Sequence, residues 1–294
     1  MNMGQRLLPA LLTLLCLGYG AVISPEGYYW QRAPVLPVIF AVIFLIQLAG
    51  LLHAWWRHTE RFYDLLGSLS FILAVCFALL LNPAPSTFNY LLAGLVVVWA
   101  ARLGSFLFLR IADVGEDRRF RRIKQSFWRF MLIWTLQGVW VSLTSSAALV
   151  AILTDMPGAV PALAWVGIGV WLLGFATEAV ADAQKSAFRK DSSRQGQFIH
   201  HGLWSVCRHP NYLGEIILWF GVWLAALPAL AGWQHAALLS PVFVVLLLTR
   251  ISGIPTLASR GLSRWGDDPA YQAYLRQTRP LMPRVPRPLP VDNA

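Results

Sequence analysis

The chain of 294 residues is 57% hydrophobic and only 13% charged, and it contains 14 Trp. This composition excludes an ordinary soluble domain, because several apolar runs reach about twenty residues, the length that spans a bilayer. The sequence therefore predicts an all-α polytopic membrane protein, a helix bundle with about seven or eight transmembrane helices.

The hydrophobic segments follow one another from the N-terminus to about residue 252. The first resembles a signal peptide, with Arg6 before an apolar core, but no polar secreted domain follows it. We therefore expect a retained helix. The Pro-rich end, residues 280–290, cannot build a helix and is expected to be a loose tail. The predicted segments lie at roughly 7–23, 35–56, 64–82, 88–110, 128–154, 160–181, 212–230 and 236–252.

The net charge of +10 does not indicate a nucleic-acid partner, because the distribution of the basic residues follows membrane topology. They fall in alternate loops, and of 24 Lys and Arg residues only Arg32 falls on the opposite side. Because basic loops stay in the cytoplasm, both termini are predicted to be cytoplasmic. The many Trp residues at segment ends are expected to anchor the helices at the membrane interfaces.

Cysteine and histidine usage predicts no metal site and no disulfide framework. Cys16, Cys76 and Cys207 are odd in number and scattered, and two of them lie in apolar runs. The six His residues show no spacing typical of metal ligands.

Four ionisable residues fall inside or at the rim of the hydrophobic segments, where charge is costly and indicates a functional site. They are Asp64, Arg102, Glu178 and Glu215. Two of them have simpler explanations. Snorkelling or a structural ion pair would account for Arg102, and a helix N-terminus would account for Asp64.

Two predicted helices each carry a pair of polar residues four apart, which share one helix face. Glu178 and Asp182 form one pair, and Asn211 and Glu215 form the other. Carboxylates can hold ribose hydroxyls and Arg clusters bind phosphate, so this combination favours a nucleotide cofactor that enters from the cytoplasm. Two alternatives are ion pairing of the two acids with the basic loop, and a basic loop that faces anionic lipid. The loop between the pairs holds Lys185, Arg189, Lys190, Arg194 and Arg208.

A resemblance enters with the residues around the second pair. The stretch Arg-His-Pro-Asn-Tyr-Leu-Gly-Glu at 208–215, with 202–204 before it and 252–255 after it, resembles the steroid 5-alpha-reductase-like membrane superfamily. In particular, it resembles the bacterial branch of the reductase C-terminal domain family. Residues 99–104 and 115–119 are also similar to that branch.

The resemblance divides the chain into three parts. Residues 1–60 are poorly matched N-terminal transmembrane helices, residues 61–285 form the reductase-like transmembrane core, and residues 286–294 are a Pro-rich tail. The implied fold is a seven-helix reductase core with a cytoplasm-facing cofactor cavity, in an integral protein of a bacterial inner membrane.

The resemblance also implies an activity, in which NADPH delivers hydride to an activated carbon–carbon double bond of a lipid or steroid-like substrate. Asn211 and Glu215 match a pair that contacts the nicotinamide end, and Asp182 matches an acid on the adenosine side. Membrane lipids are the other expected partners, with no obligate protein partner and no nucleic acid. The further cofactor-binding residues predicted are Arg102, Glu178, Arg189, Arg208, Trp219 and Arg250.

The sequence departs from this family in the substrate half. Characterised steroid reductases carry a Gln-Glu pair on an early helix and a Tyr that polarises the substrate carbonyl, and this chain has no Gln-Glu dipeptide. Asp64 and Tyr63 are the candidates for the catalytic groups, and Tyr90 and Gln137 are possible substitutes.

Two other functions are compatible with parts of the sequence. Isoprenylcysteine and phospholipid methyltransferases, which use S-adenosylmethionine, share Arg-His-Pro-x-Tyr, and residues 264–266 with Tyr271 and Tyr274 resemble the rest of their motif. Their usual Glu-Glu pair is absent from residues 254–260, and this absence favours a reductase. A lipid-binding or transport protein is disfavoured, because the predicted helices are uninterrupted and show no repeat.

Overall fold

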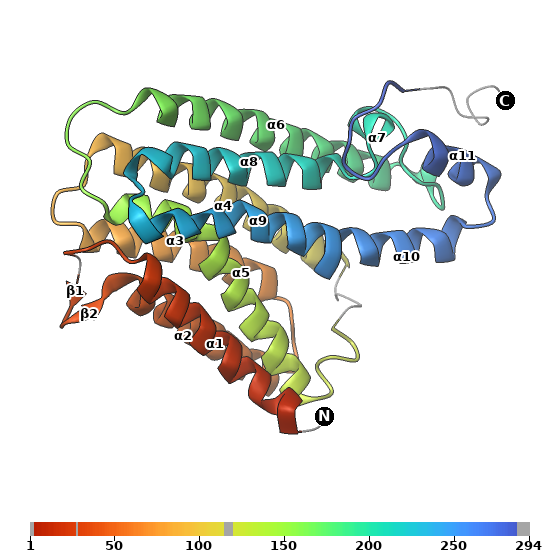
Figure 1. The fold of residues 1–294 in the computed structure, drawn as a ribbon. Helices are drawn as coiled ribbons and strands as arrows, with labels where there is room; N and C mark the ends of the chain where they lie inside the picture. The colour runs from red at the N-terminus through yellow and green to blue at the C-terminus, as the bar shows by residue number, and fades with distance from the viewer. Residues whose placement is uncertain (1–2, 28, 115–119, 287–294) are drawn as a thin grey trace. The chain divides into compact units, whose positions relative to one another are not determined.

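The computed structural model describes residues 3–27, 29–114 and 120–286 of the chain. In this part of the chain, eight helices are long and apolar enough to cross a membrane. The predicted all-α polytopic fold of an integral multi-pass membrane protein is therefore confirmed (Figure 1). The described strands form a single short antiparallel hairpin of Tyr29–Trp30 and Ala33–Pro34.

The chain divides into two compact units. The first contains Met1–Ile168 and Val222–Ser240, and the second contains Gly169–Gly221 and Pro241–Ala294. The divisions fall inside three helices, which each contribute residues to both units. These helices are α6 (Ala162–Lys190), α8 (Pro210–Ala226) and α9 (Leu239–Leu246).

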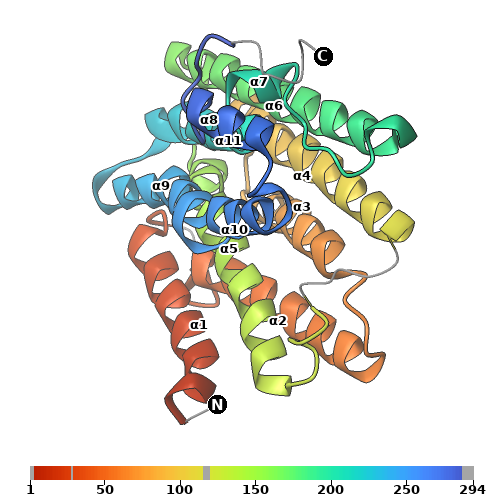
Figure 2. The same cartoon turned by 90° about the vertical axis from the view of Figure 1, so that its right-hand side faces the viewer.

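In the first unit, α5 (Phe127–Leu153) is the central helix, and it contacts the four helices that precede it. In Figure 2 it lies between α1 and α2. Residues 147–153 are completely buried, and three of the seven are Ala, a small residue that lets neighbouring helices approach closely. The surrounding helices are α1 (Met3–Ile23), α2 (Val35–Trp56), α3 (Tyr63–Leu81) and α4 (Thr87–Val114).

Two buried Asn side chains donate hydrogen bonds to main-chain carbonyls in the last turn of α5. The last carbonyls of a helix have no partner within it, and away from water they need another donor. The Asn82 side chain donates to the carbonyl of Ile152 at 2.7 Å, and the Asn89 side chain donates to that of Ala151 at 2.9 Å. These bonds fix α3 and α4 against the C-terminus of α5.

In the second unit, α6 and α8 lie side by side (Figure 1) and meet at glycines. A methyl group added to Gly214 of α8 would lie 2.5 Å from the backbone nitrogen of Glu178 on α6. Gly174 makes the corresponding close approach from α6 to Leu218. Two helix backbones come this close only where a residue without a side chain lies at the contact, as in the small-residue interfaces of membrane helices.

The short helix α7 (Leu203–Val206) is fastened to α6. Gly202 precedes it with a positive φ of 60° and packs on the side chain of Gln184, a backbone position that suits glycine. The Gln184 side chain accepts a hydrogen bond from the Leu203 amide at 3.0 Å. The Trp204 indole donates to the carbonyl of Ala181 at 3.1 Å. These contacts hold the loop that precedes α8.

The last membrane span, Gly232–Trp265, is not the regular helix that the sequence predicts. It begins as a 3₁₀ helix, η3 (Gly232–Leu238), and continues through α9 into a π-helical turn, η4 (Leu247–Ile251). The expectation of uninterrupted helices was therefore wrong. The bond that defines the π turn joins residues five apart: the Ser252 amide donates to the Leu247 carbonyl at 2.9 Å.

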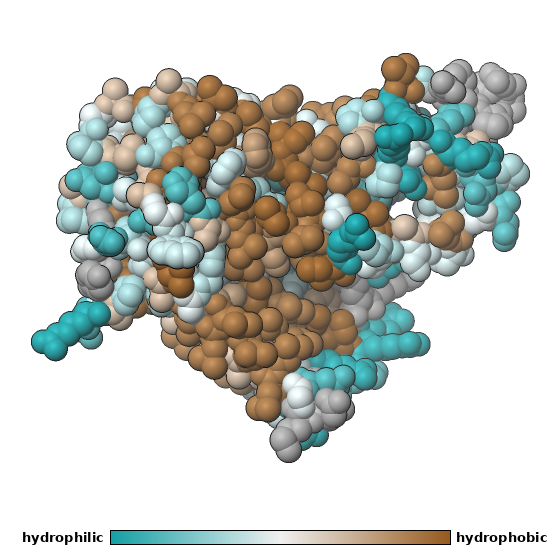
Figure 3. Space-filling view, in the orientation of Figure 1, coloured by the Kyte–Doolittle hydropathy of each residue, from teal (hydrophilic) through white to brown (hydrophobic). Residues whose placement is uncertain are grey.

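Two helices complete the second unit after the π turn, α10 (Gly253–Trp265) and α11 (Pro269–Gln277). Asp268 caps α11, since its side chain accepts the Ala270 amide at 2.8 Å, and Pro269 occupies the first helical position. Figure 3 shows hydrophobic residues along α6 and α8, and hydrophilic residues gathered over α7 and α11. The polar end of this unit therefore lies at α7 and α11.

We predict that Gly214→Ala lowers the free energy of unfolding by roughly 1–3 kcal/mol, the usual cost of an overpacked contact. The added methyl group would meet the backbone of α6. Thermal unfolding in detergent is the measurement. Gly169→Ala on α6 is the matched control, because a Cβ there has no neighbour within 4 Å. The higher helix propensity of Ala should leave this variant at least as stable as the parent. Equal stability of the two variants would contradict the close approach.

Candidate functional site

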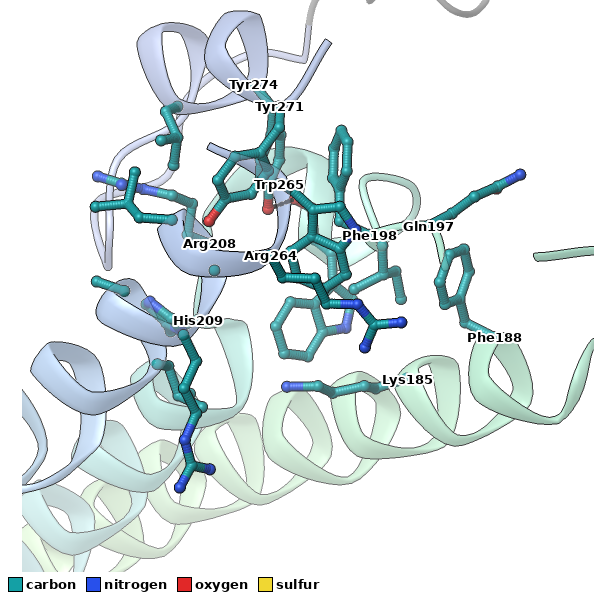
Figure 4. Close-up of a pocket in the computed structure, with 18 of the residues that line it drawn as sticks. Lys185, Phe188, Gln197, Phe198, Arg208, His209, Arg264, Trp265, Tyr271 and Tyr274 are labelled. Carbon is teal, nitrogen blue, oxygen red and sulfur yellow. Dashed lines mark hydrogen bonds between the residues drawn. The ribbon is translucent and has the colours of Figure 1, made fainter. Parts of the chain in front are cut away.

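The second unit contains a cavity of about 680 Å³, within the ~300–1,000 Å³ range of small-molecule sites. Figure 4 shows Lys185 and Phe188 reaching it from α6, and Tyr271 and Tyr274 from α11. Residues of α10 and of the loop after α6 complete the lining. The cavity has the size of a nucleotide or cofactor site.

The charged residues that line the cavity, all of which the structure describes, are basic, with no Asp or Glu among them. Lys185 lies with its ammonium 4.4 Å from the ring centre of Trp204. Arg194 is held by Asp191, outside the lining, with an N–O distance of 3.1 Å. A cavity with basic charges of one sign raises the local concentration of anions. The basic lining residues are Lys185, Arg189, Arg194, Arg208, Arg260 and Arg264.

Aromatic rings form the other part of the lining. Phe198 is buried, and its ring centre lies 5.0 Å from that of Tyr271 and 5.4 Å from that of Tyr274. The Tyr274 hydroxyl donates to the Trp204 carbonyl at 2.8 Å, and the Trp265 indole donates to the Gly196 carbonyl. Burial raises the pKa of both tyrosines, so the phenols stay neutral. The rings form a fixed apolar surface on which a flat ring can stack.

Three polar atoms at the start of α8 are buried without a hydrogen-bond partner among the described residues. They are Arg208 Nε, His209 Nδ1 and Asn211 Oδ1. A buried polar group left unsatisfied costs about 1–3 kcal/mol. Arg208 and His209 also line the cavity. Three such atoms within four residues indicate that a ligand or ordered water completes their bonding.

His209 is neutral in this environment. Burial, followed by the nearby charges of Lys185 and Arg208, lowers the pKa of its imidazole to about 3. The ring stacks on Tyr212 with a distance of 5.5 Å between ring centres. A neutral imidazole has one donor and one acceptor nitrogen, so His209 can orient a polar ligand without adding charge.

The predicted facing of the two polar pairs is partly visible in the structure. The Asn211 amide donates to the Asp182 carboxylate at 3.3 Å, so α6 and α8 bring one member of each pair together. Glu178 is also buried, at the contact of its backbone with Gly214. Glu215 lies one turn further along α8, half-buried. Glu178, Asp182 and Asn211 therefore lie at the contact between α6 and α8. Neither these three residues nor Glu215 is among the residues that line the cavity.

The remaining predicted cofactor residues of the second unit differ in their surroundings. Arg189 and Arg208 line the cavity. Trp219 is completely buried on α8. Arg250 lies in the π turn, is exposed and is not a lining residue. The roles assigned to these residues remain predictions.

Three predicted site residues belong to the first unit. The Tyr63 hydroxyl donates to the Ile133 carbonyl at 3.0 Å, and Asp64 forms an ion pair with Arg110 at 3.8 Å. Arg102 is half-buried on α4. The catalytic assignment of Tyr63 and Asp64 stays a prediction, and the family-like stretch 115–119 lies outside the described residues.

The sequence did not predict the aromatic surface of the cavity. The sequence alone indicates no function for Phe188 and Phe198, and Trp265, Tyr271 and Tyr274 resemble only part of the methyltransferase motif. The available signal was the interleaving of aromatic with basic residues in two segments, 185–208 and 260–275. Only the fold shows that these segments line one cavity.

Comparison with known proteins gives one match. Residues 51–278 match a family described as a protein of unknown function, DUF1295. The chain belongs to the DUF1295 family. The matched range includes every residue that lines the cavity. No curated protein and no solved structure matches this family member.

We predict that acid destabilises the protein partly through His209. Because its folded pKa of about 3 lies below its usual 6.5, the unfolded state binds more protons between these values. The contribution of His209 to the free energy of unfolding is complete above pH 6.5. As the pH falls from there towards 3, this contribution decreases by about 1.4 kcal/mol per unit.

Thermal unfolding between pH 7 and pH 4 is the measurement. His209→Gln removes the titrating group, so the variant should lose stability less steeply than the parent. His235→Gln, at an exposed position, is the control and should leave the slope unchanged. Identical slopes for parent and His209→Gln would contradict the buried neutral imidazole.

Proposed function

We propose that the protein is an integral-membrane reductase that uses NADPH and acts on an activated carbon–carbon double bond of a lipid or steroid-like substrate. The observation that carries this proposal is the cavity, whose charged lining residues are all basic and whose remaining wall is rich in aromatic rings. NADPH combines several phosphates with flat rings, so its chemistry fits both parts of the lining.

The lining residues suit defined parts of such a cofactor. Arg189 and Arg208 supply guanidinium groups, which bind phosphate through paired charge-assisted hydrogen bonds. Phe198, Tyr271 and Trp265 supply surfaces for an adenine ring. A basic residue that holds a 2′-phosphate would favour NADPH over NADH.

The start of α8 suits the other end of the cofactor. The buried Asn211 Oδ1 has no partner among the described residues and can accept a hydrogen bond from a carboxamide, while Glu215 follows one turn later. When bound, NADPH supplies the hydride, and the protein contributes binding, orientation and exclusion of water. Tyr63 and Asp64, in the first unit, are proposed as catalytic groups from the sequence alone.

The proposed orientation has the cavity in the cytoplasm, together with both termini. Its lining comes from the basic segments that the positive-inside rule assigns to that side. A bacterial inner membrane, with NADPH supplied from the cytoplasm, is the proposed location.

A methyltransferase that uses S-adenosylmethionine is the second candidate. The observation in its favour is that Trp265, Tyr271 and Tyr274 line the cavity, because aromatic faces attract a sulfonium cation. The basic lining opposes it, since this cofactor carries a net positive charge in its reactive form. The charge of the cavity therefore favours NADPH.

We predict that the purified protein in detergent binds NADPH with low-micromolar or tighter affinity, and NADH more weakly. Isothermal titration calorimetry with NADPH, NADH and S-adenosylmethionine is the measurement. Phosphate contacts weaken as counterions screen them, so NADPH affinity should also fall between low and high salt. Binding of S-adenosylmethionine alone would refute the reductase proposal.

We predict that Glu215→Gln and Arg208→Gln each weaken NADPH binding roughly tenfold or more, since loss of a hydrogen bond to a charged group costs about 1.5–3 kcal/mol. Asn211→Ala should weaken it by roughly threefold to tenfold, because a bond between neutral groups contributes about 0.5–1.5 kcal/mol. Arg276→Gln is the matched control for Arg208→Gln, because Arg276 is exposed and does not line the cavity. Thermal unfolding checks that each variant is folded. If all variants bind like the parent, the cofactor site has been misplaced.

A further inference from the structure

The chain does not become a free tail after α11. Residues 278–284, here called the C-terminal strap, run along the turn at residues 206–209 and form three main-chain hydrogen bonds with it. The Arg208 amide donates to the Arg279 carbonyl at 3.0 Å, and the His209 amide donates to the Pro280 carbonyl at 3.1 Å. The Arg284 amide donates to the Val206 carbonyl at 3.0 Å. The loose tail predicted from Pro280 onward is therefore wrong for residues 280–284.

The strap starts from a buried anchor. Thr278 is only 6% exposed, and its hydroxyl donates to the Tyr274 carbonyl at 2.6 Å. Tyr274 in turn donates its own hydroxyl to the Trp204 carbonyl at 2.8 Å, on the helix that precedes the turn. Pro280 and Pro283 restrict the backbone of the strap and lower its conformational entropy. The strap is thus held at its start and stiffened along its length.

The turn that the strap holds presents two lining residues to the cavity. Arg208 and His209 lie between α7 and α8, and their side chains carry two of the three buried atoms without partners. Their amides precede the first residue of α8 and donate to the strap. Loss of these bonds would release the backbone that orients the side chains of Arg208 and His209. The strap therefore acts on these two residues through their backbone.

We propose that the C-terminal strap is a positioning element of the ligand site, whose backbone fixes Arg208 and His209 in the orientation that faces the cavity. The family match ends at residue 278, so it does not include the strap beyond that position. The identity of the ligand rests on the proposed function, but the positioning role applies to any anion bound in the cavity. Its readouts therefore include two that need no ligand.

Two substitutions at Arg284 test the proposal in the full-length chain. The Arg284 side chain is exposed and does not line the cavity. Arg284→Pro removes the amide that donates to Val206, whereas Arg284→Ala removes the same charge and keeps the amide. We expect Arg284→Pro to weaken NADPH binding about fivefold or more, and Arg284→Ala to leave it within twofold of the parent.

Two measurements without ligand accompany the binding experiment. Hydrogen exchange resolved at single residues should show protected amides at Arg208 and His209 in the parent, and faster exchange of both in Arg284→Pro. NMR of the histidine rings should show the His209 titration moving from about pH 3 towards its usual range in Arg284→Pro, but not in Arg284→Ala.

The outcomes separate the two proposals. Fast exchange of the Arg208 and His209 amides in the parent would overturn the strap, even if Arg284→Pro failed to fold. So would equal exchange, titration and affinity in the two Arg284 variants. If NADPH does not bind but exchange and titration respond as expected, the strap stands and the reductase proposal fails.

Discussion

The contact between α6 and α8 is the constraint on which the unit that contains the cavity depends. Inside a bilayer, polar groups must find partners within the protein because lipid offers none. Gly174 and Gly214 remove the side chains that would keep the two backbones apart. The contact then places Asp182 within hydrogen-bond distance of Asn211. Each helix thereby supplies a hydrogen-bond partner for a polar residue of the other, and this bond fixes the start of α8 against α6.

The cavity is built on this base by the end of α6 and by α10, together with the short segments that lie outside the membrane spans. Nucleotide sites in soluble α/β proteins use a Gly-rich turn between a strand and a helix, and the described part of this chain has no such arrangement. Here α7 is tied to α6 through Gln184 and Ala181, and α11 to α7 through Tyr274. Hydrogen bonds to main-chain groups therefore hold the segments that surround the cavity. Basic and aromatic side chains form its lining.

How far the sequence predicts this structure depends on the range of the interactions involved. Hydropathy predicted the eight spans because each span depends only on a run of consecutive apolar residues. Spacing of four residues gave the shared faces of Glu178 with Asp182 and of Asn211 with Glu215, which the Asn211–Asp182 bond supports. The meeting of Phe198 with Tyr271 was not predictable, because some seventy residues separate them and hydrophobicity alone does not define a partner. The strap was misjudged because its bonds are main-chain bonds, which leave no side-chain signature.

The π turn at Leu247–Ile251 has a consequence for the register of everything after it. A π turn accommodates one residue more than an α turn, and at 3.6 residues per turn this rotates the following helix by about 100°. The π turn and the non-helical backbone of Ser252 after it, with a φ of -133°, together set which residues of α10 meet the cavity. These residues include Leu257, Ala258 and Gly261. The shape of the cavity is thus set partly by a helical phase, independently of the identity of any lining side chain.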